Sequence, residues 1–296
     1  MIERKVARPR TTLALRTEDL AMTTPKSILV HLDSSTRTAT RVRLARKLAE
    51  AFDAQVTGMP CTLSAFVRYP SALEGAADAV AIMLALDKKS RDNAYATFMD
   101  AGGDSPHMHW AEPMSDAPWG FSRRALYADL LILGQRDGDN AYAGELPAEF
   151  VSTLLVESGR PALVLPYIAT GSVDTVGRTV LVAWKETREA ARAVTAALPW
   201  LSGAARVHAV CYGEEAESQL RSLQDYLNSH GVTATVQAGV QGEGDAGAQL
   251  LSLAADVGAD LLVMGCYGHS RAREWLLGGV TRTILQSMTL PVLMSH

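Results

Sequence analysis

The fold is indicated by one stretch of sequence that occurs twice, as Ala128-Asp129-Leu130-Leu131-Ile132-Leu133-Gly134 and, 131 residues later, as Ala259-Asp260-Leu261-Leu262-Val263-Met264-Gly265. Each copy is a run of continuous apolar residues that ends in glycine. Such a run is typical of a strand buried on both faces of a parallel sheet, because helices cover both faces of these sheets. We therefore expect one such strand in each half of the chain.

Two further pairs of segments repeat in the same order. Pro161-Ala162-Leu163-Val164-Leu165 matches Pro291-Val292-Leu293-Met294, and Ile28-Leu29-Val30-His31-Leu32-Asp33 resembles Val180-Leu181-Val182-Ala183-Trp184-Lys185. Three matches in one order indicate a duplicated unit. We place the units at 27–166 and 178–296, joined by a linker from Tyr167 to Gly177 that is rich in Gly, Ser, Thr and Asp. Residues 1–26 are expected to be a flexible extension.

Within each unit, strand-like runs alternate with helical patterns, which is typical of βαβ units and a mostly parallel, doubly wound sheet. In the second unit the expected strands are 179–184, 205–211, 232–238, 260–265 and 291–295, and the expected helices are 187–200, 215–230, 245–257 and 279–288. The first unit has additional residues between Cys61 and Gly103. There, apolar residues at helical spacing predict a long or doubled helix that serves as a packing face or as a cover that binds a partner.

The composition excludes several classes of protein. The chain has 296 residues, of which 48% are hydrophobic and 20% charged, as in globular proteins. A net charge of −4 argues against sequence-independent nucleic-acid binding. Three scattered cysteines fit neither a disulfide framework nor a structural metal site. No apolar run reaches the ~18 residues that span a bilayer, so we expect a cytoplasmic protein without a membrane partner.

The segment that carries the chemistry runs from Gly265 to Thr281. It follows the second copy of the buried strand and leads into the helix expected at 279–288. Junctions of this kind, at the carboxyl edge of a parallel sheet, bind ligands in doubly wound folds. Glycines let the backbone approach a ligand closely, and the helix start offers unpaired N–H groups and the positive end of the helix dipole. The segment therefore predicts an anion site.

The glycine spacing in this segment resembles the ATP loop of the universal stress protein family. That loop reads glycine, two residues, glycine, nine residues, glycine and then Ser or Thr, and Gly265, Gly268 and Gly278 fit it. The resemblance covers about 27–296 and is closest to members with two domains in one chain. It implies an adenine nucleotide alpha hydrolase-like (Rossmann-like) fold with five strands per domain. It also implies that the two domains pair through their last strands, as an intramolecular pseudo-dimer, with a homodimer as a further option.

The resemblance also implies the ligand, ATP or another adenine nucleotide with Mg²⁺ as an option, and its contacts. The predicted nucleotide-binding residues are Ala183, Trp184, Lys185, Val210, Met264, Gly265, Gly268, His269, Ser270, Gly278, Gly279, Val280 and Thr281. Two positions depart from the family pattern. Gly279 replaces the Ser or Thr after the third glycine, and Thr281 is expected to supply a hydroxyl instead. Lys185 replaces an Asp near the ribose, and a lysine cannot accept hydrogen bonds from sugar hydroxyls.

The first unit keeps the aspartate that the second unit lacks, but it does not keep the glycine loop. Asp33 is present there, but the loop after Gly134 has the wrong glycine spacing. Asp137, Asp139 and Glu145 are expected to place up to three negative charges where phosphates would lie. At ~6 Å and an effective dielectric near 20, each like-charge pair costs about 2–3 kcal/mol. We therefore expect the first unit to be a poor nucleotide site.

Several side chains near the second loop have two interpretations. Tyr267 covers a base or packs at the sheet edge, and Trp184 stacks on a purine or belongs to the core. Cys266 is a redox-sensitive thiol or a small buried hydrophobe. His107 and His109 share a strand face but lack further metal ligands.

Two functions from different classes remain. The first is an adenine-nucleotide-binding regulatory protein of the stress response that binds its ligand in the second unit. The second is a nucleotide-free module that acts through protein partners. No placed general base or metal-binding carboxylate pair is evident, so we expect no enzyme beyond a weak ATPase.

Overall fold

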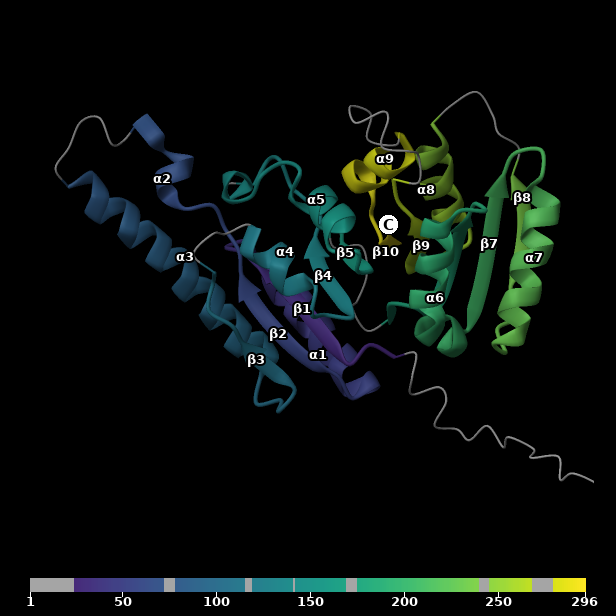
Figure 1. The fold of residues 1–296 in the computed structure, drawn as a ribbon, viewed down its shortest axis with the longest axis horizontal. Coiled ribbons are helices and arrows are strands. Elements are labelled where there is room, and N and C mark those ends of the chain that lie inside the picture. The colour runs from purple at the N-terminus through teal and green to yellow at the C-terminus, as the bar shows by residue number, and fades with distance from the viewer. Residues whose placement is uncertain are drawn as a thin grey trace, which may run out of the picture.

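The computed structural model describes residues 24–71, 78–114, 119–140, 142–168, 175–239, 245–267 and 279–296. Within these ranges one continuous sheet runs through the whole molecule, in the order β3-β2-β1-β4-β5-β10-β9-β6-β7-β8 (Figure 1). Its strands are β1 (Ser27–Leu32), β2 (Gln55–Pro60), β3 (Met108–Trp110), β4 (Leu130–Gly134), β5 (Ala162–Leu165), β6 (Thr179–Trp184), β7 (Arg206–Tyr212), β8 (Thr235–Gly239), β9 (Leu261–Gly265) and β10 (Val292–Ser295).

Helices alternate with these strands and cover both faces of the sheet. They are α1 (Thr38–Phe52), α2 (Ala65–Arg68), α3 (Ala79–Gly102), α4 (Trp119–Ala125), α5 (Phe150–Glu157), α6 (Arg188–Gly203), α7 (Ala216–Ser229), α8 (Ala246–Asp256) and α9 (Gly279–Ser287), with a short 3₁₀ turn at Ala143–Glu145. The doubly wound α/β class predicted from the sequence is thus confirmed. Among the described helices, none combines the length and apolarity needed to cross a membrane.

The two halves join through their last strands. β5 and β10 pair antiparallel, with Leu163 opposite Leu293, whereas every other strand pair of the sheet is parallel. The pairing implied by the family resemblance is therefore present. An antiparallel junction places the carboxyl edge of the first half beside the amino edge of the second, because the strands of the two halves run in opposite directions.

The expected elements of the second unit are all found, with boundaries that differ by a few residues. The additional residues of the first unit form two helices, α2 and α3, as the doubled-helix prediction allowed. Residues 1–23 of the predicted extension and 169–174 of the predicted linker lie outside the described residues.

The duplication extends to hydrogen bonds at the amino edge of the sheet. Asp129 precedes β4, and its Oδ2 accepts a hydrogen bond from the backbone N–H of Ser27 at 3.0 Å. Asp260 precedes β9, and its Oδ1 accepts one from the backbone N–H of Thr179 at 3.1 Å. Each aspartate therefore fixes the first strand of its half beside the central strand.

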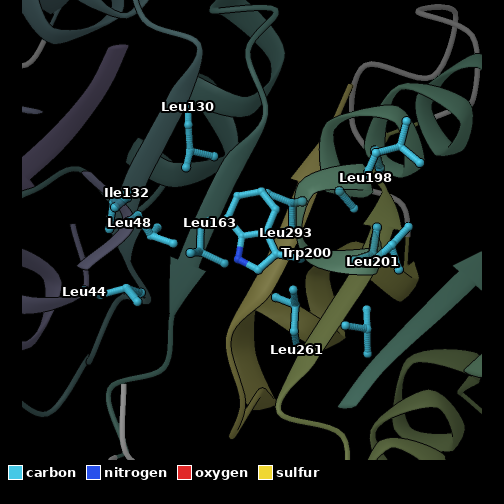
Figure 2. Close-up of a cluster of buried hydrophobic side chains, with 14 of the residues drawn as sticks. Leu44, Leu48, Leu130, Ile132, Leu163, Leu198, Trp200, Leu201, Leu261 and Leu293 are labelled. Atoms are coloured by element: carbon cyan, nitrogen blue, oxygen red, sulfur yellow. The ribbon is translucent and has the colours of Figure 1, made fainter. Parts of the chain in front are cut away.

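The core lies in two layers, one on each face of the sheet, and both layers run through the two halves. Figure 2 shows the junction in one layer, where Trp200 of α6 lies between Leu163 of β5 and Leu261 of β9. The Trp200 ring also makes a T-shaped contact with the ring of Phe52 from α1, with centroids 5.3 Å apart. Because the buried surface is shared, the halves stabilise one another.

Candidate functional site

Three strands of the second half bring their carboxyl ends together. Ala183 of β6 is paired with Val210 of β7 on one side and with Met264 of β9 on the other. Trp184 and Lys185 follow directly at the end of β6. Residues that are far apart in the sequence thus meet at one edge, as a doubly wound sheet requires of a ligand site.

The side chains at this edge point in different directions. Val210 and Met264 are buried in the core layer beneath α8 and α9, so only their backbone groups can contact a ligand. Trp184 packs against the opposite core layer. Its Nε1 is buried and has no hydrogen-bond partner among the described residues, which does not support a ring stacked on a purine. Lys185 is exposed and offers its ammonium group to an anion.

Gly265 has a packing role that the sequence analysis did not predict. A Cβ atom at this position would lie 2.5 Å from the backbone nitrogen of Ala190 and 2.7 Å from the carbonyl carbon of Glu189. Both are backbone atoms in the first turn of α6. Backbone atoms of a helix cannot move aside as the end of a flexible side chain can. The glycine therefore lets the end of β9 approach α6 closely.

The start of α9 is open at Gly279. This glycine is exposed, and no heavy atom of the described residues lies within 4 Å of the position that a Cβ would take. Val280 is half-buried in the core layer. The side chain of Thr281 is buried, with 4% exposure, so its hydroxyl is not open at the helix start, and its predicted contact with phosphate stays a prediction. What α9 offers at its open end is backbone N–H groups and its dipole.

The rest of the glycine loop lies in 268–278, outside the described residues. Gly268, His269, Ser270 and Gly278 therefore stay predictions.

Cys266 and Tyr267, which end the described part of this segment, are both packing residues. Burial, and the nearby carboxylate of Glu189, raise the pKa of the Cys266 thiol to about 12, which rules against a redox-sensitive thiolate. Tyr267 packs against the core layer with its ring edge toward His296. Burial raises the pKa of Tyr267 to about 12, against a smaller opposing influence of the Ser152 hydroxyl of α5.

At the carboxyl edge of the first half, the structure shows a cavity of about 500 Å³. It lies between the turn after β1, the loop after β4 and the start of α5. Because the sheet continues through β5 and β10, residues from the amino edge of the second half, Asp260 and Leu290, complete its wall. The sequence analysis gave preference to the second half and did not foresee this cavity.

The buried guanidinium group of Arg41 lies beside the ends of β1 and β4 at this edge of the sheet. Its Nη2 lies 2.7 Å from Oδ1 of Asp33, and its Nε donates a hydrogen bond to the backbone oxygen of His31 at 2.9 Å. A Cβ at Gly134 would lie 2.3 Å from Nη1 of Arg41. The guanidinium group thus covers the glycine at the end of β4, and the Asp33 carboxylate is already paired. Burial raises the pKa of Asp33, but Arg41, His31 and the hydroxyls of Ser35 and Thr38 together outweigh burial and hold this pKa well below its usual range.

The second half of the chain is similar in sequence to known proteins. The profile of the Universal stress protein family matches residues 177–296. The sequence likeness to this family therefore covers the second half of the chain. A curated universal stress protein from Methanocaldococcus jannaschii is 29% identical over 82 residues, which are 27% of this chain. The matching stretch spans 48% of that relative, about half of its length.

Solved universal stress proteins extend the likeness to the first half, at the level of the fold. A structure from Archaeoglobus fulgidus is 15% identical, with a TM-score of 0.67, and the match covers 91% of this chain and 95% of that chain. A putative universal stress protein from Pseudomonas aeruginosa is also 15% identical, with a TM-score of 0.59, over 93% of this chain and 94% of that chain. Both halves therefore have the universal stress protein fold.

Glu145, in the first universal stress protein-like half, does not lie where the sequence analysis placed it. Its carboxylate is buried and accepts hydrogen bonds from Ser34 Oγ at 2.8 Å and Ser90 Oγ at 3.1 Å. Arg68 Nη1 lies 3.7 Å away. Its negative charge therefore holds α3 against the turn after β1. Of the three acids invoked against phosphate binding, Asp137 alone lines the cavity.

The described residues contain no group of three or more His, Cys, Asp or Glu side chains that could hold a metal ion. His107 and His109 instead lie on either side of the Gln55 amide: His109 Nε2 is 2.6 Å from its Oε1, and His107 Nδ1 is 3.3 Å from its Nε2.

The sequence analysis did not predict the contacts of two residues in the first half, Arg41 and Gln135. Arg41 lies on the buried stripe of α1 with Thr38 and Ala45, and a charged residue on an apolar stripe signals a buried ion pair. Gln135 donates from Nε2 to the backbone oxygen of Leu285 in α9 at 3.0 Å, which links the halves. No signal in the sequence marks Gln135, because its partner is 150 residues away.

His31 makes stability depend on pH. Burial lowers the pKa of this imidazole from 6.5 to about 4. Between these values the unfolded chain binds a proton that the folded chain does not, so stability falls as pH falls through this window. The loss should approach about 3 kcal/mol at the lower end. Urea unfolding at pH 7 and pH 4 measures it.

The control for His31 is His31→Gln, which retains a donor for the backbone oxygen that His31 bonds, that of Cys61. Because glutamine does not titrate, the variant should lose about 3 kcal/mol less than the wild type over the same pH range. Equal losses in both proteins would contradict the assignment to His31.

Proposed function

We propose that the second half binds an adenine nucleotide, ATP or a close relative, at the shared carboxyl edge of β6, β7 and β9. The protein then acts as a regulator of the stress response whose state depends on that ligand. The observation that carries the proposal is the exposed start of α9 at Gly279, where no atom of the described residues lies near the Cβ position, beside three converging strand ends. The first turn of a helix has backbone N–H groups without partners in the helix, and these suit an anion. The sequence likeness of this half to the family and its glycine spacing support the choice of ligand.

Each part of the edge has a distinct role in this proposal. The amides of Gly279, Val280 and Thr281 hold a phosphate group, and the loop from Gly268 to Gly278 wraps around the remaining phosphates. Lys185 provides a phosphate contact where a ribose contact would otherwise lie, because an ammonium group donates and does not accept. Ala183, Val210 and Met264 contribute backbone groups to the wall that faces the base and sugar.

The direct test is to denature freshly purified protein and look for released adenine nucleotide by chromatography. Thermal shift with added ATP then measures binding. At a ligand concentration one hundred times Kd, binding should stabilise the protein by about 2.7 kcal/mol. In Gly278→Asp, a carboxylate at ~6 Å from a phosphate should weaken binding by about 100-fold, and the shift should disappear.

The matched control is Gly138→Asp, which adds the same charge to the loop of the first half. The nearest atom to a Cβ at Gly138 is Nη1 of Arg136 at 3.7 Å, so the side chain fits. ATP stabilisation should survive in this variant. If it is lost in Gly138→Asp and retained in Gly278→Asp, the nucleotide lies in the first-half cavity and the proposed location is wrong. If the wild type shows neither released nucleotide nor a thermal shift, the nucleotide-free module that acts through protein partners is the better reading.

A further inference from the structure

The amino-terminal half of α3 exposes large apolar side chains. Val80, Ile82 and Leu84 are at least half exposed, and Leu86 is 38% exposed. Residues 79–86 contain no charged side chain. A helix segment that is apolar all round is normally buried. In Figure 1 this end of α3 extends with α2 beyond the strands of the sheet, and the described part of the chain leaves it uncovered.

One face of α3 is already occupied. Met83 is buried, and the Asp87 carboxylate accepts hydrogen bonds from Ser64 Oγ and the backbone N–H of Ala65, both at 2.6 Å. Asp87 thereby caps the start of α2. Ser90 on the same face bonds to Glu145. These contacts fix the orientation of α3, and therefore fix which of its side chains point away from the molecule.

A stripe on another face combines the apolar residues with opposite charges at its two ends. Asp78, Ile82, Leu86 and Lys89 are separated by four, four and three residues, which places them along one side of a helix. All four are exposed. Asp78 is the N-cap residue of α3, yet its side chain makes no capping hydrogen bond. Its carboxylate is therefore not used by the amides of its own helix.

This stripe is complementary to itself. If two copies of α3 pack antiparallel with Ile82 opposite Leu86, Asp78 of each copy lies within one residue of the position opposite Lys89. Two apolar contacts and two ion pairs then form around one two-fold axis, as an isologous interface requires. The stripe of Val80, Leu84, Lys88 and Arg91, on the opposite side of the helix, has cations at one end only, so it lacks this property.

The junction strands do not compete for this role. β5 and β10 are paired with each other within the chain, so that route to association is already used. We propose that the protein forms a homodimer through α3, in which the Asp78–Leu86–Lys89 side of one copy packs antiparallel on the same side of a second copy. The interface is small, so the dimer dissociates on dilution.

Sedimentation velocity over a dilution series from about 1 mM to about 1 μM tests the proposal, because small interfaces dissociate in this range. The wild type should change from two chains to one across the series. Ile82→Glu with Leu86→Glu should be a monomer throughout, since both sites are exposed and the fold does not depend on them. The matched control, Val80→Glu with Leu84→Glu, adds the same charge to the opposite side of the helix and should still dimerise.

Reversing the charges at Asp78 and Lys89 tests how the two α3 helices are aligned in the dimer. Asp78→Lys should weaken the dimer by about 10-fold, because it places cations opposite one another. Adding Lys89→Glu to the same chain should restore the dimer, since the ion pairs are re-formed with the signs exchanged. A wild type that stays monomeric at the highest concentration overturns the proposal. So does a dimer that survives in the Ile82 and Leu86 variant, or a double reversal that restores nothing.

Discussion

Replacing Arg41 by methionine should lower the free energy of unfolding by about 3–5 kcal/mol, because it leaves the Asp33 carboxylate without its partner. The Arg41 side chain is 2% exposed and that of Asp33 is 12% exposed, so water replaces little of the lost ion pair. The backbone oxygen of His31 and the hydroxyl of Thr38 also lose a donor, the latter at 2.7 Å. Urea unfolding at neutral pH measures the loss.

The matched control for Arg41 is Arg43→Met, on the exposed side of the same helix, which should change stability by less than about 0.5 kcal/mol. The deficit of Arg41→Met should also shrink in acid. Without Arg41, burial raises the pKa of Asp33, and protonation then removes the uncompensated charge. A deficit equal to that of Arg43→Met, or one that does not change with pH, would argue against the ion pair as the cause.

Replacing Trp200 by alanine should cost about 3–5 kcal/mol, because it opens a cavity in the core layer that the two halves share. Trp200 is 6% exposed and lies at the junction of the two halves, between Leu163 of β5 and Leu261 of β9, as Figure 2 shows. It also packs against Gly177, where a Cβ would lie 2.5 Å from Cδ1 of the indole. Guanidinium unfolding followed by circular dichroism measures the change.

Two controls separate packing from polarity at Trp200. Trp200→Phe should cost much less than alanine, since the ring volume is largely kept and the indole Nε1 has no hydrogen-bond partner among the described residues. Trp119→Ala removes a tryptophan that is 56% exposed and should cost less than about 1 kcal/mol. If Trp200→Phe were as damaging as alanine, the cavity explanation would fail.

The repeated apolar runs were sufficient to predict the parallel sheet, the duplicated units and the order of helices and strands. They were sufficient because strand burial on both faces and helical periodicity are local properties, written in consecutive residues such as Leu130–Leu133 and Leu261–Met264. The convergence of Ala183, Val210 and Met264 was also predictable, since parallel strands end at the same edge.

The first-half cavity, and the packing role of Gly265 against α6, were not predictable in the same way. Both depend on residues brought together from distant parts of the chain. Glu145 shows the difference most clearly: its charge was expected among phosphates, but Ser34, Ser90 and Arg68 surround it. A count of charges along a loop does not reveal which of them the fold turns inward.

The sequence by itself determined the α/β class, the two-fold repeat and the glycine loop in which the nucleotide is expected. Only the tertiary structure decided that Arg41 covers Gly134, that the halves share one core through β5 and β10, and that the Asp78–Lys89 side of α3 faces away from the body. The reason is physical. Periodicity fixes which residues of one element are buried, whereas the contacts between elements depend on how their surfaces meet.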